Sequence, residues 1–145
     1  MRLSSLADYA VVMMAAAARH CGTARLNATE LASETGVPLP TAQKLVSRLA
    51  AAGLIESARG TGGGFRLARP AAAISLADIV EAVEGPIAMT VCVDPDRHDC
   101  ALDQHCAVRP HWGVVNEAIR AALDNVTLLH LSRPPAIPAA PKVIA

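Results

Sequence analysis

The chain has 145 residues, 52% of them hydrophobic, and its 13 basic and 13 acidic side chains give a formal net charge of zero. This length suits one small domain with an extension, and the apolar content excludes disorder of the whole chain. Residues 1–70 carry eight basic and four acidic side chains, whereas residues 78–103 carry one basic and seven acidic. This asymmetry excludes a uniformly basic nucleic-acid binder and favours a polyanion-binding module joined to an acidic segment.

The few aromatic residues and the hydrophobic runs narrow the class of protein further. Tyr9, Phe65 and Trp112 are the only aromatic residues, which argues against single-strand binding by base stacking. The uncharged run from Tyr9 to Ala18 is too short to span a bilayer, and Asp8 beside it argues against a signal peptide. We therefore expect a cytoplasmic protein with no membrane association, in which clustered cysteines indicate metal or redox chemistry.

The first half of the chain is predicted to contain three helices. The first spans residues 5–20, is capped by Ser4 or Ser5 and ends at Gly22. Its apolar positions recur at spacings of three and four: Leu6, Tyr9, Ala10, Met13, Ala16 and Ala17. A second helix begins near Asn27, where Glu30 can complete a capping box, and stops at Gly36. Pro40 suits the first turn of a third helix that runs to about Gly53. The second helix, the turn at Gly36 and the third helix together have the order of a helix-turn-helix.

A β-hairpin is predicted directly after the third helix. The strand-like runs 54–59 and 65–69 flank a glycine-rich tip, and this tip lacks the Gly-Lys-Ser/Thr ending of a nucleotide-binding loop. A hairpin in this position is a wing, so residues 1–74 are predicted to form a winged helix-turn-helix domain. The alternative is an ordinary helical hairpin with a solvated polar face.

The polar face of the third helix and the hairpin are predicted to bind double-stranded DNA. Gln can pair with adenine in the major groove, whereas Lys and Arg reach guanine or phosphate. The candidate DNA-binding residues are Pro40, Thr41, Gln43, Lys44, Arg48, Arg59, Gly60 and Arg66.

The second half of the chain is predicted to add two helices around an irregular loop. Ser75 caps a helix that runs to Glu84, residues 91–110 form the loop, and a long helix runs from about His111 to Leu131. The wide apolar stripe of this long helix predicts a homodimer that presents two recognition helices to a palindromic operator, and packing within one chain is the alternative. The fold class is thus mainly α, with residues 75–132 as a second region that contains the loop and the dimerisation helix. Residues 133–145 are expected to be a mobile Pro-rich tail.

Three cysteines lie in the acidic loop, so the loop within residues 75–132 is predicted to bind a cluster. Cys92, Cys100 and Cys106 lack the CxxC pairing of zinc ribbons, and their longer gaps leave room for an iron–sulfur cluster. The alternatives are a zinc site, a thiol switch, a disulfide with a spare thiol, or unrelated cysteines. Cys21 is expected to be a buried structural thiol. With no catalytic triad or paired-carboxylate motif, no enzymatic activity is expected.

These motifs together resemble the IscR/NsrR-type iron–sulfur-sensing transcription regulators over residues 1–131. The resemblance is carried by Met-Arg-Leu at the start, Leu-Val-Ser-Arg-Leu at 45–49, Gly-Leu at 53–54, Arg-Gly-x-Gly-Gly-Gly-Phe at 59–65 and the three cysteines. The stretch 105–112 is similar to the branch that regulates SUF-type iron–sulfur cluster assembly. The resemblance implies a homodimeric repressor or activator that holds a [2Fe–2S] or [4Fe–4S] cluster and whose DNA affinity follows the cluster state. It also implies that Gln43 discriminates between operators and that Arg59 contacts DNA.

The fourth cluster ligand departs from one family pattern. IscR-like members carry a ligand His three residues after the last cysteine, and Arg109 stands there in this chain. NsrR-like members take an Asp near the N-terminus from the partner subunit, and Asp8 occupies that position. Asp8 from the partner is therefore the expected fourth ligand, with His111 as the alternative. His105 and His98 are further candidates, and a small molecule or no fourth ligand are the remaining alternatives.

Overall fold

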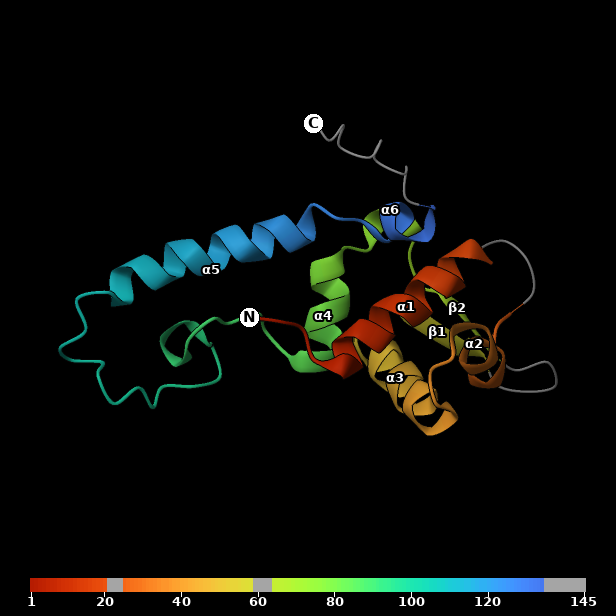
Figure 1. Cartoon of the computed structure of the whole chain (residues 1–145), viewed down its shortest axis with the longest axis horizontal. Coiled ribbons are helices and arrows are strands. Elements are labelled where there is room, and N and C mark those ends of the chain that lie inside the picture. Colours follow the sequence, from red (N-terminus) through yellow and green to blue (C-terminus); the bar gives the residue numbers. More distant parts are fainter. Residues whose placement is uncertain (21–24, 59–63, 135–145) are drawn as a thin grey trace, which may run out of the picture.

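The computed structural model describes residues 1–20, 25–58 and 64–134. The chain forms a mainly helical body from which one long helix extends (Figure 1). The elements in chain order are α1 (Ser5–Arg19), α2 (Ala28–Thr35), α3 (Leu39–Ala51), β1 (Ile55–Ala58), β2 (Gly64–Leu67), η1 (Ala71–Ala73), α4 (Leu76–Glu84), η2 (Val91–Val93), α5 (Arg109–Asp124) and α6 (Leu128–Ser132). This order confirms the predicted fold class. Predictions that concern Gly22, Cys21 and residues 135–145 fall outside the described residues.

Helix α1 lies at the centre of the body and packs against α2, α3, α4 and α6. Ala10, Met13 and Ala16 on this helix are fully buried or nearly so, as their spacing predicts. Tyr9 was expected on the same face, but this prediction is wrong, because its side chain is 37% exposed. The buried face of α1 is centred on Ala10, Met13, Met14 and Ala17, and residue 9 lies on its flank.

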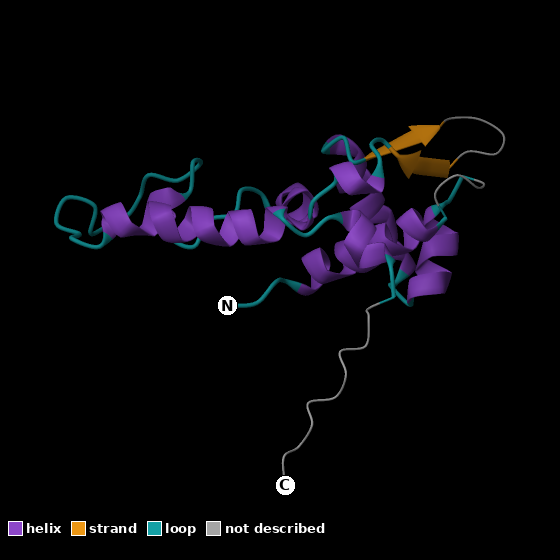
Figure 2. Ribbon diagram, turned by 90° about the horizontal axis from the view of Figure 1, so that it is seen from above, coloured by secondary structure: helices purple, strands orange, loops and turns teal. Residues whose placement is uncertain are grey.

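The hairpin that follows α3 is a two-stranded antiparallel sheet with Ser57 opposite Phe65 (Figure 2). Leu26, just before α2, adds a bridge to it: its amide donates to the Phe65 carbonyl at 3.2 Å, and the Phe65 amide donates back at 2.7 Å. This third backbone comes so close that a Cβ built on Gly64 would lie 2.4 Å from the Leu26 carbonyl oxygen. Glycine is therefore required at residue 64 for a packing reason.

The predicted helix from His111 to Leu131 is wrong in its extent, because the chain breaks into α5 and α6. The side chain of Thr127 accepts a hydrogen bond from the His130 amide at 3.3 Å and starts a new helix there. Next to it, the Leu76 amide donates to the Val126 carbonyl at 2.7 Å. The break returns the chain to the body, where Leu128 is fully buried. None of the helices in the described parts of the chain has the length and apolarity to cross a bilayer.

Candidate functional site

The helix-turn-helix is defined by local hydrogen bonds at both ends of α2. The Asn27 side chain accepts from the Glu30 amide at 2.8 Å, and the Glu30 carboxylate accepts from the Asn27 amide at 3.1 Å. Gly36 ends α2 with a φ of 77°, in the left-handed region that favours glycine. Val37 is buried in the turn, and α3 begins at Leu39. The predicted capping box, turn and third helix are therefore all present.

Helix α3 separates an apolar face from a polar face. Ala42, Leu45 and Leu49 are buried in the core. On the other side Pro40, Gln43 and Lys44 are exposed, and Thr41 is half-buried. The helix contains no acidic residue, and its N-terminal end carries a partial positive charge. This surface is free to approach a polyanion.

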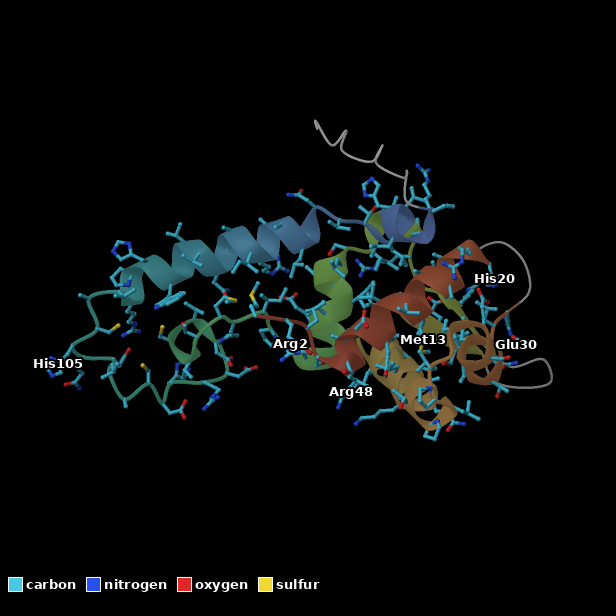
Figure 3. The ribbon with its side chains drawn as sticks, in the orientation of Figure 1. Arg2, Met13, His20, Glu30, Arg48 and His105 are labelled. Atoms are coloured by element: carbon cyan, nitrogen blue, oxygen red, sulfur yellow. The ribbon has the colours of Figure 1, made fainter. Side chains whose placement is uncertain are left out.

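Arg48 has a contact that the sequence did not predict. Its Nη1 donates a hydrogen bond of 2.6 Å to the backbone carbonyl of Val83, near the C-terminal end of α4. The side chain is labelled in Figure 3, on α3. The two residues are 35 positions apart, so no local pattern signals the bond. In this structure Arg48 joins α3 to α4, and its contact with DNA remains a prediction.

The wing carries less free positive charge than its arginines suggest. Arg66 lies directly opposite Glu56 in the strand register, and its Nε and Nη2 both lie 3.2 Å from the Glu56 Oε2. Both side chains are more than half exposed, so the pair is weak and DNA phosphate can compete for Arg66. Arg69, at the base of the wing, lies 3.6 Å from Asp78. Arg59 and Gly60 lie outside the described residues.

The cysteine loop, which we define as residues 90–108, lies at the end of the molecule reached by the N-terminus of α5 (Figure 1). Cys92, Cys100 and Cys106 are free thiols and half-buried. The Sγ of Cys92 lies 3.1 Å from the Thr90 hydroxyl oxygen. Among the described residues, no three His, Cys, Asp or Glu side chains are grouped to hold a metal ion. The donors are present on one loop, but this conformation does not assemble them.

The candidate fourth ligands are separated from one another. Asp8 is exposed on the first turn of α1, whereas His98, His105 and His111 are exposed in or beside the loop. Figure 3 places His105 at the outer end of the loop, far from the core residue Met13. Arg109, at the position where the resemblance to IscR-like members leads one to expect a histidine, pairs with Asp103.

Charge pairs within the loop reduce its acidity only in part. Arg97 donates to Asp99 at 3.1 Å, and this bond holds the pKa of the Asp99 carboxyl below its usual range. Asp94 uses its side chain to accept the Asp96 amide at 2.9 Å, which forms a local turn. The loop therefore keeps negative charge at neutral pH and is unsuited to contact DNA.

The loop is attached to the body at its start through α4 and α5. The side-chain Nδ2 of Asn116 donates to the Ile87 carbonyl at 2.9 Å, and its Oδ1 accepts a hydrogen bond from the backbone amide of Met89 at 2.9 Å. Arg120 donates from Nε and Nη2 to the two carboxylate oxygens of Glu81 at 3.1 and 3.2 Å, which raises the Arg120 pKa above its usual value. Because these partners are 27 to 39 positions apart, no local sequence pattern predicts the contacts between them. A pocket of about 520 Å³ opens beside them, lined in part by Arg2, Glu84, Met89, Asp94 and Ile119.

The chain is similar to transcriptional regulators along most of its length. Residues 3–134 match the Rrf2 family, described as iron-dependent transcriptional regulators. The HTH-type transcriptional regulator IscR of Yersinia enterocolitica is 32% identical over 131 residues, covering 90% of this chain and 79% of the relative. The protein of the same name from Photobacterium profundum is 33% identical over 133 residues, covering 92% and 76%.

Solved structures show the same fold. CymR, the global cysteine regulator of B. subtilis, superposes with a TM-score of 0.70 at 27% identity, covering 91% of this chain and 96% of that one. IscR of T. potens superposes with a TM-score of 0.66 at 27% identity, covering 90% and 85%. These relatives are transcriptional regulators rather than enzymes. The chain belongs to the Rrf2 family of iron-dependent, DNA-binding transcriptional regulators.

Proposed function

We propose that the chain is a homodimeric regulator, acting as a repressor, whose operator affinity is switched by an iron–sulfur cluster on Cys92, Cys100 and Cys106. The observation that carries this proposal is the presence of three free, half-buried thiols on one loop attached to a winged-helix body. The donor types fit the cluster, since thiolates are its usual ligands. A bound cluster supplies an iron centre sensitive to iron supply and oxidants. The resemblance of residues 105–112 favours control of iron–sulfur cluster assembly genes.

The loop must rearrange to bring its thiols together, and this rearrangement is the proposed signal. In the described conformation no three ligands are grouped, so binding draws Cys92, Cys100 and Cys106 toward one point. The acidic side chains of the loop move with them. A loop with two conformations meets the requirement for a switch, provided that one conformation favours DNA binding.

The dimer is proposed from the surface of α5. None of its residues is buried, and the apolar side chains of Val114 and Val115 are 73% and 40% exposed. Ala118 and Ala122 extend this apolar surface along the same helix. A 16-residue helix that leaves such a surface uncovered is typical of a subunit interface. Two subunits related by a two-fold axis then present two α3 helices to a palindromic operator in double-stranded DNA.

Asp8 of the partner subunit is the proposed fourth ligand. Its carboxylate is exposed on α1 and is not grouped with the cysteines of its own chain. If it reaches the partner's loop, cluster binding joins α1 of one subunit to the loop of the other and fixes the separation of the two recognition helices. His111, which is exposed at the start of α5, is the alternative ligand.

A cysteine-based switch without a cluster is the second candidate function. It is favoured by the structural likeness to CymR, since S. aureus CymR, which has been solved in an oxidized form, superposes with a TM-score of 0.69 at 28% identity. A zinc ion on the same thiols is a further form of this alternative.

One experiment separates these functions. Protein purified without oxygen is analysed for visible absorption, iron, sulfide and zinc, and its binding to a duplex selected from random DNA is measured in each form. Visible bands with matching iron and sulfide, and a DNA affinity that changes when they are removed, support the cluster switch. Colourless protein with stoichiometric zinc supports the metal alternative. Colourless, metal-free protein whose affinity changes on thiol oxidation supports the cysteine switch, and the cluster proposal then fails.

A further inference from the structure

The Glu81 carboxylate on α4 binds elements on both sides of the cysteine loop. Arg120 of α5, which follows the loop, donates to both of its oxygens. The amide of Ile87, which precedes the loop, donates to Oε1 at 3.3 Å. One half-buried carboxylate thus bonds both to the segment that precedes the loop and to the helix that follows it. A shift of either end changes the environment of the other.

Asn116 completes this attachment from α5. It lies four residues before Arg120, so both side chains leave the same face of the helix. Its amide group uses its donor and its acceptor at once, on the Ile87 carbonyl and the Met89 amide. With the bond to Glu81, three backbone groups of residues 87–89 are held by two side chains. Cys92 follows only three residues later, so a movement of its thiol displaces residues 87–89 as well.

The last turn of α4 also contacts the recognition helix and α1. The Val83 carbonyl, two residues after Glu81, accepts the 2.6 Å bond from Arg48 of α3. Glu84 accepts a 3.1 Å bond from the Ser4 amide, at the start of the helix that carries Asp8. Residues 81–84 therefore touch the base of the loop, α5, α3 and α1 within a single helical turn.

We propose that residues 81–84 couple the cysteine loop to the recognition helix, with Glu81 and Asn116 as positioning residues. The hydrogen bonds are directional, so residues 87–89 cannot move without displacing the end of α4 or breaking these bonds. Because the turn of α4 is rigid, its displacement reaches α3 through Arg48. This inference rests on the proposed function, which supplies two states of the loop with different DNA affinities.

The test compares how strongly each variant responds to the state of the loop. Full-length wild-type protein, Glu81→Gln and Asn116→Ala are each measured on one selected duplex, first after reconstitution with iron and sulfide and then as reduced, metal-free protein. The quantity of interest is the ratio of the two dissociation constants, for which typical couplings give about 5- to 150-fold. We expect this ratio to fall toward one in both variants, while one of the two dissociation constants stays within about three-fold of wild type.

A role in stability alone gives a different result, because it shifts both dissociation constants by the same factor and leaves the ratio unchanged. The matched control is Glu34→Gln, which removes an interhelical carboxylate bonded to Arg19 and His20 outside this network. Its ratio is expected to equal that of wild type. Glu81→Gln preserves the shape of the side chain and an acceptor for Ile87, so it remains informative if Asn116→Ala does not fold.

Hydrogen exchange gives a second measurement that needs neither DNA nor a cluster. In a Cys21→Ala background, alkylation with iodoacetamide changes only the thiols of the loop. Exchange in the α3 peptide is expected to respond to alkylation in the otherwise wild-type protein, whereas in Asn116→Ala the response stays within the loop. An equal response of α3 in both proteins overturns the coupling. If both variants keep the large wild-type ratio of dissociation constants, the coupling through residues 81–84 is wrong, but the proposed function still holds. If the wild-type ratio itself is one, both the proposed function and the coupling fail.

Discussion

The amide of Leu128 donates a 2.7 Å hydrogen bond to the carbonyl of Ile74, and this contact returns the chain to the core after α5. Beside it, Ser75 and Thr127 form an isolated antiparallel bridge. Leu128 is fully buried and packs in the same core as α1. Helix α5 is thereby anchored at its C-terminal end by α6, while its N-terminal end carries the cysteine loop.

This anchor leads to a prediction about stability. Leu128→Ala removes a fully buried side chain and is expected to lower the free energy of unfolding by about 3 kcal/mol. The neighbouring half-buried Leu129 provides the control, since Leu129→Ala is expected to cost clearly less. Urea denaturation followed by circular dichroism measures both, and equal losses would contradict the assignment of Leu128 to the core.

Two exposed residues of α3 are expected to contribute differently to DNA binding. Lys44→Ala should weaken binding to all duplexes and reduce the slope of log affinity against log salt by about 1, because one phosphate contact is lost. Gln43→Ala should cost about 1–3 kcal/mol on the selected duplex and relax its sequence preference. Fluorescence anisotropy at several salt concentrations gives both quantities. Arg133→Ala, which removes an exposed cation outside α3, is the control. An affinity independent of salt would rule out the proposed phosphate contacts.

The cluster proposal predicts that the three cysteines of the loop are needed for cluster binding and that Cys21 is not. Cys92→Ala, Cys100→Ala and Cys106→Ala should each abolish stoichiometric iron and sulfide binding, whereas Cys21→Ala should retain it. Inductively coupled plasma analysis and a sulfide assay after anaerobic reconstitution measure the difference. Retention of a full cluster by any of the three loop variants would exclude that cysteine as a ligand.

Asp8→Ala tests the contribution of the partner subunit. The variant is expected to alter the absorption spectrum or to speed cluster loss in air, since a ligand from the other chain is removed. The fold should be retained, because the Asp8 side chain is exposed. His111→Ala is the comparison. A cluster that is unchanged in Asp8→Ala and altered in His111→Ala would transfer the role to the histidine.

The exposed face of α5 predicts a dimer that a single charge can weaken. Val115→Glu places a carboxylate within the apolar surface and is expected to raise the dimer dissociation constant at least about 10-fold. Because no residue of α5 is buried in the single chain, its fold should survive. Sedimentation velocity measures the dissociation constant, with Glu117→Ala, at an exposed polar position of α5, as control. A dimer of unchanged affinity would place the interface elsewhere.

The ion pairs between α1 and α2 predict a small dependence of stability on pH. The hydrogen bond from His20 lowers the pKa of Glu34 in the folded state below its ordinary value of 4.5. The stabilisation is therefore present above pH 4.5 and is lost as the pH falls through the lower folded pKa. Glu34→Gln should cost about 0.5 kcal/mol at pH 7, because the pair is partly exposed, and this cost should shrink toward pH 3.5. An equal cost at both pH values would contradict the shift.

Features set by neighbours three or four residues apart could be predicted from the sequence. The Asn27–Glu30 capping box, the end of the second helix at Gly36 and the third helix after the turn were all predicted and are present. Such features depend on backbone geometry and side-chain periodicity within one or two turns, which the order of residue types already contains. The same local information predicted the winged-helix order and the position of the cysteine loop.

Only the tertiary structure decided the features that join distant segments. The break between α5 and α6 follows from backbone pairing with residues 74–76, although the apolar pattern runs on through it. The bond from Arg48 to Val83 and the two bonds of Asn116 join residues 27 to 35 positions apart. Polar contacts of this kind leave no periodic trace in the sequence, because each depends on which helix faces meet after the core has packed. The order of residue types thus predicted the helix-turn-helix, the hairpin and the cysteine loop of this regulator, and the packing of its helices decided how they are connected.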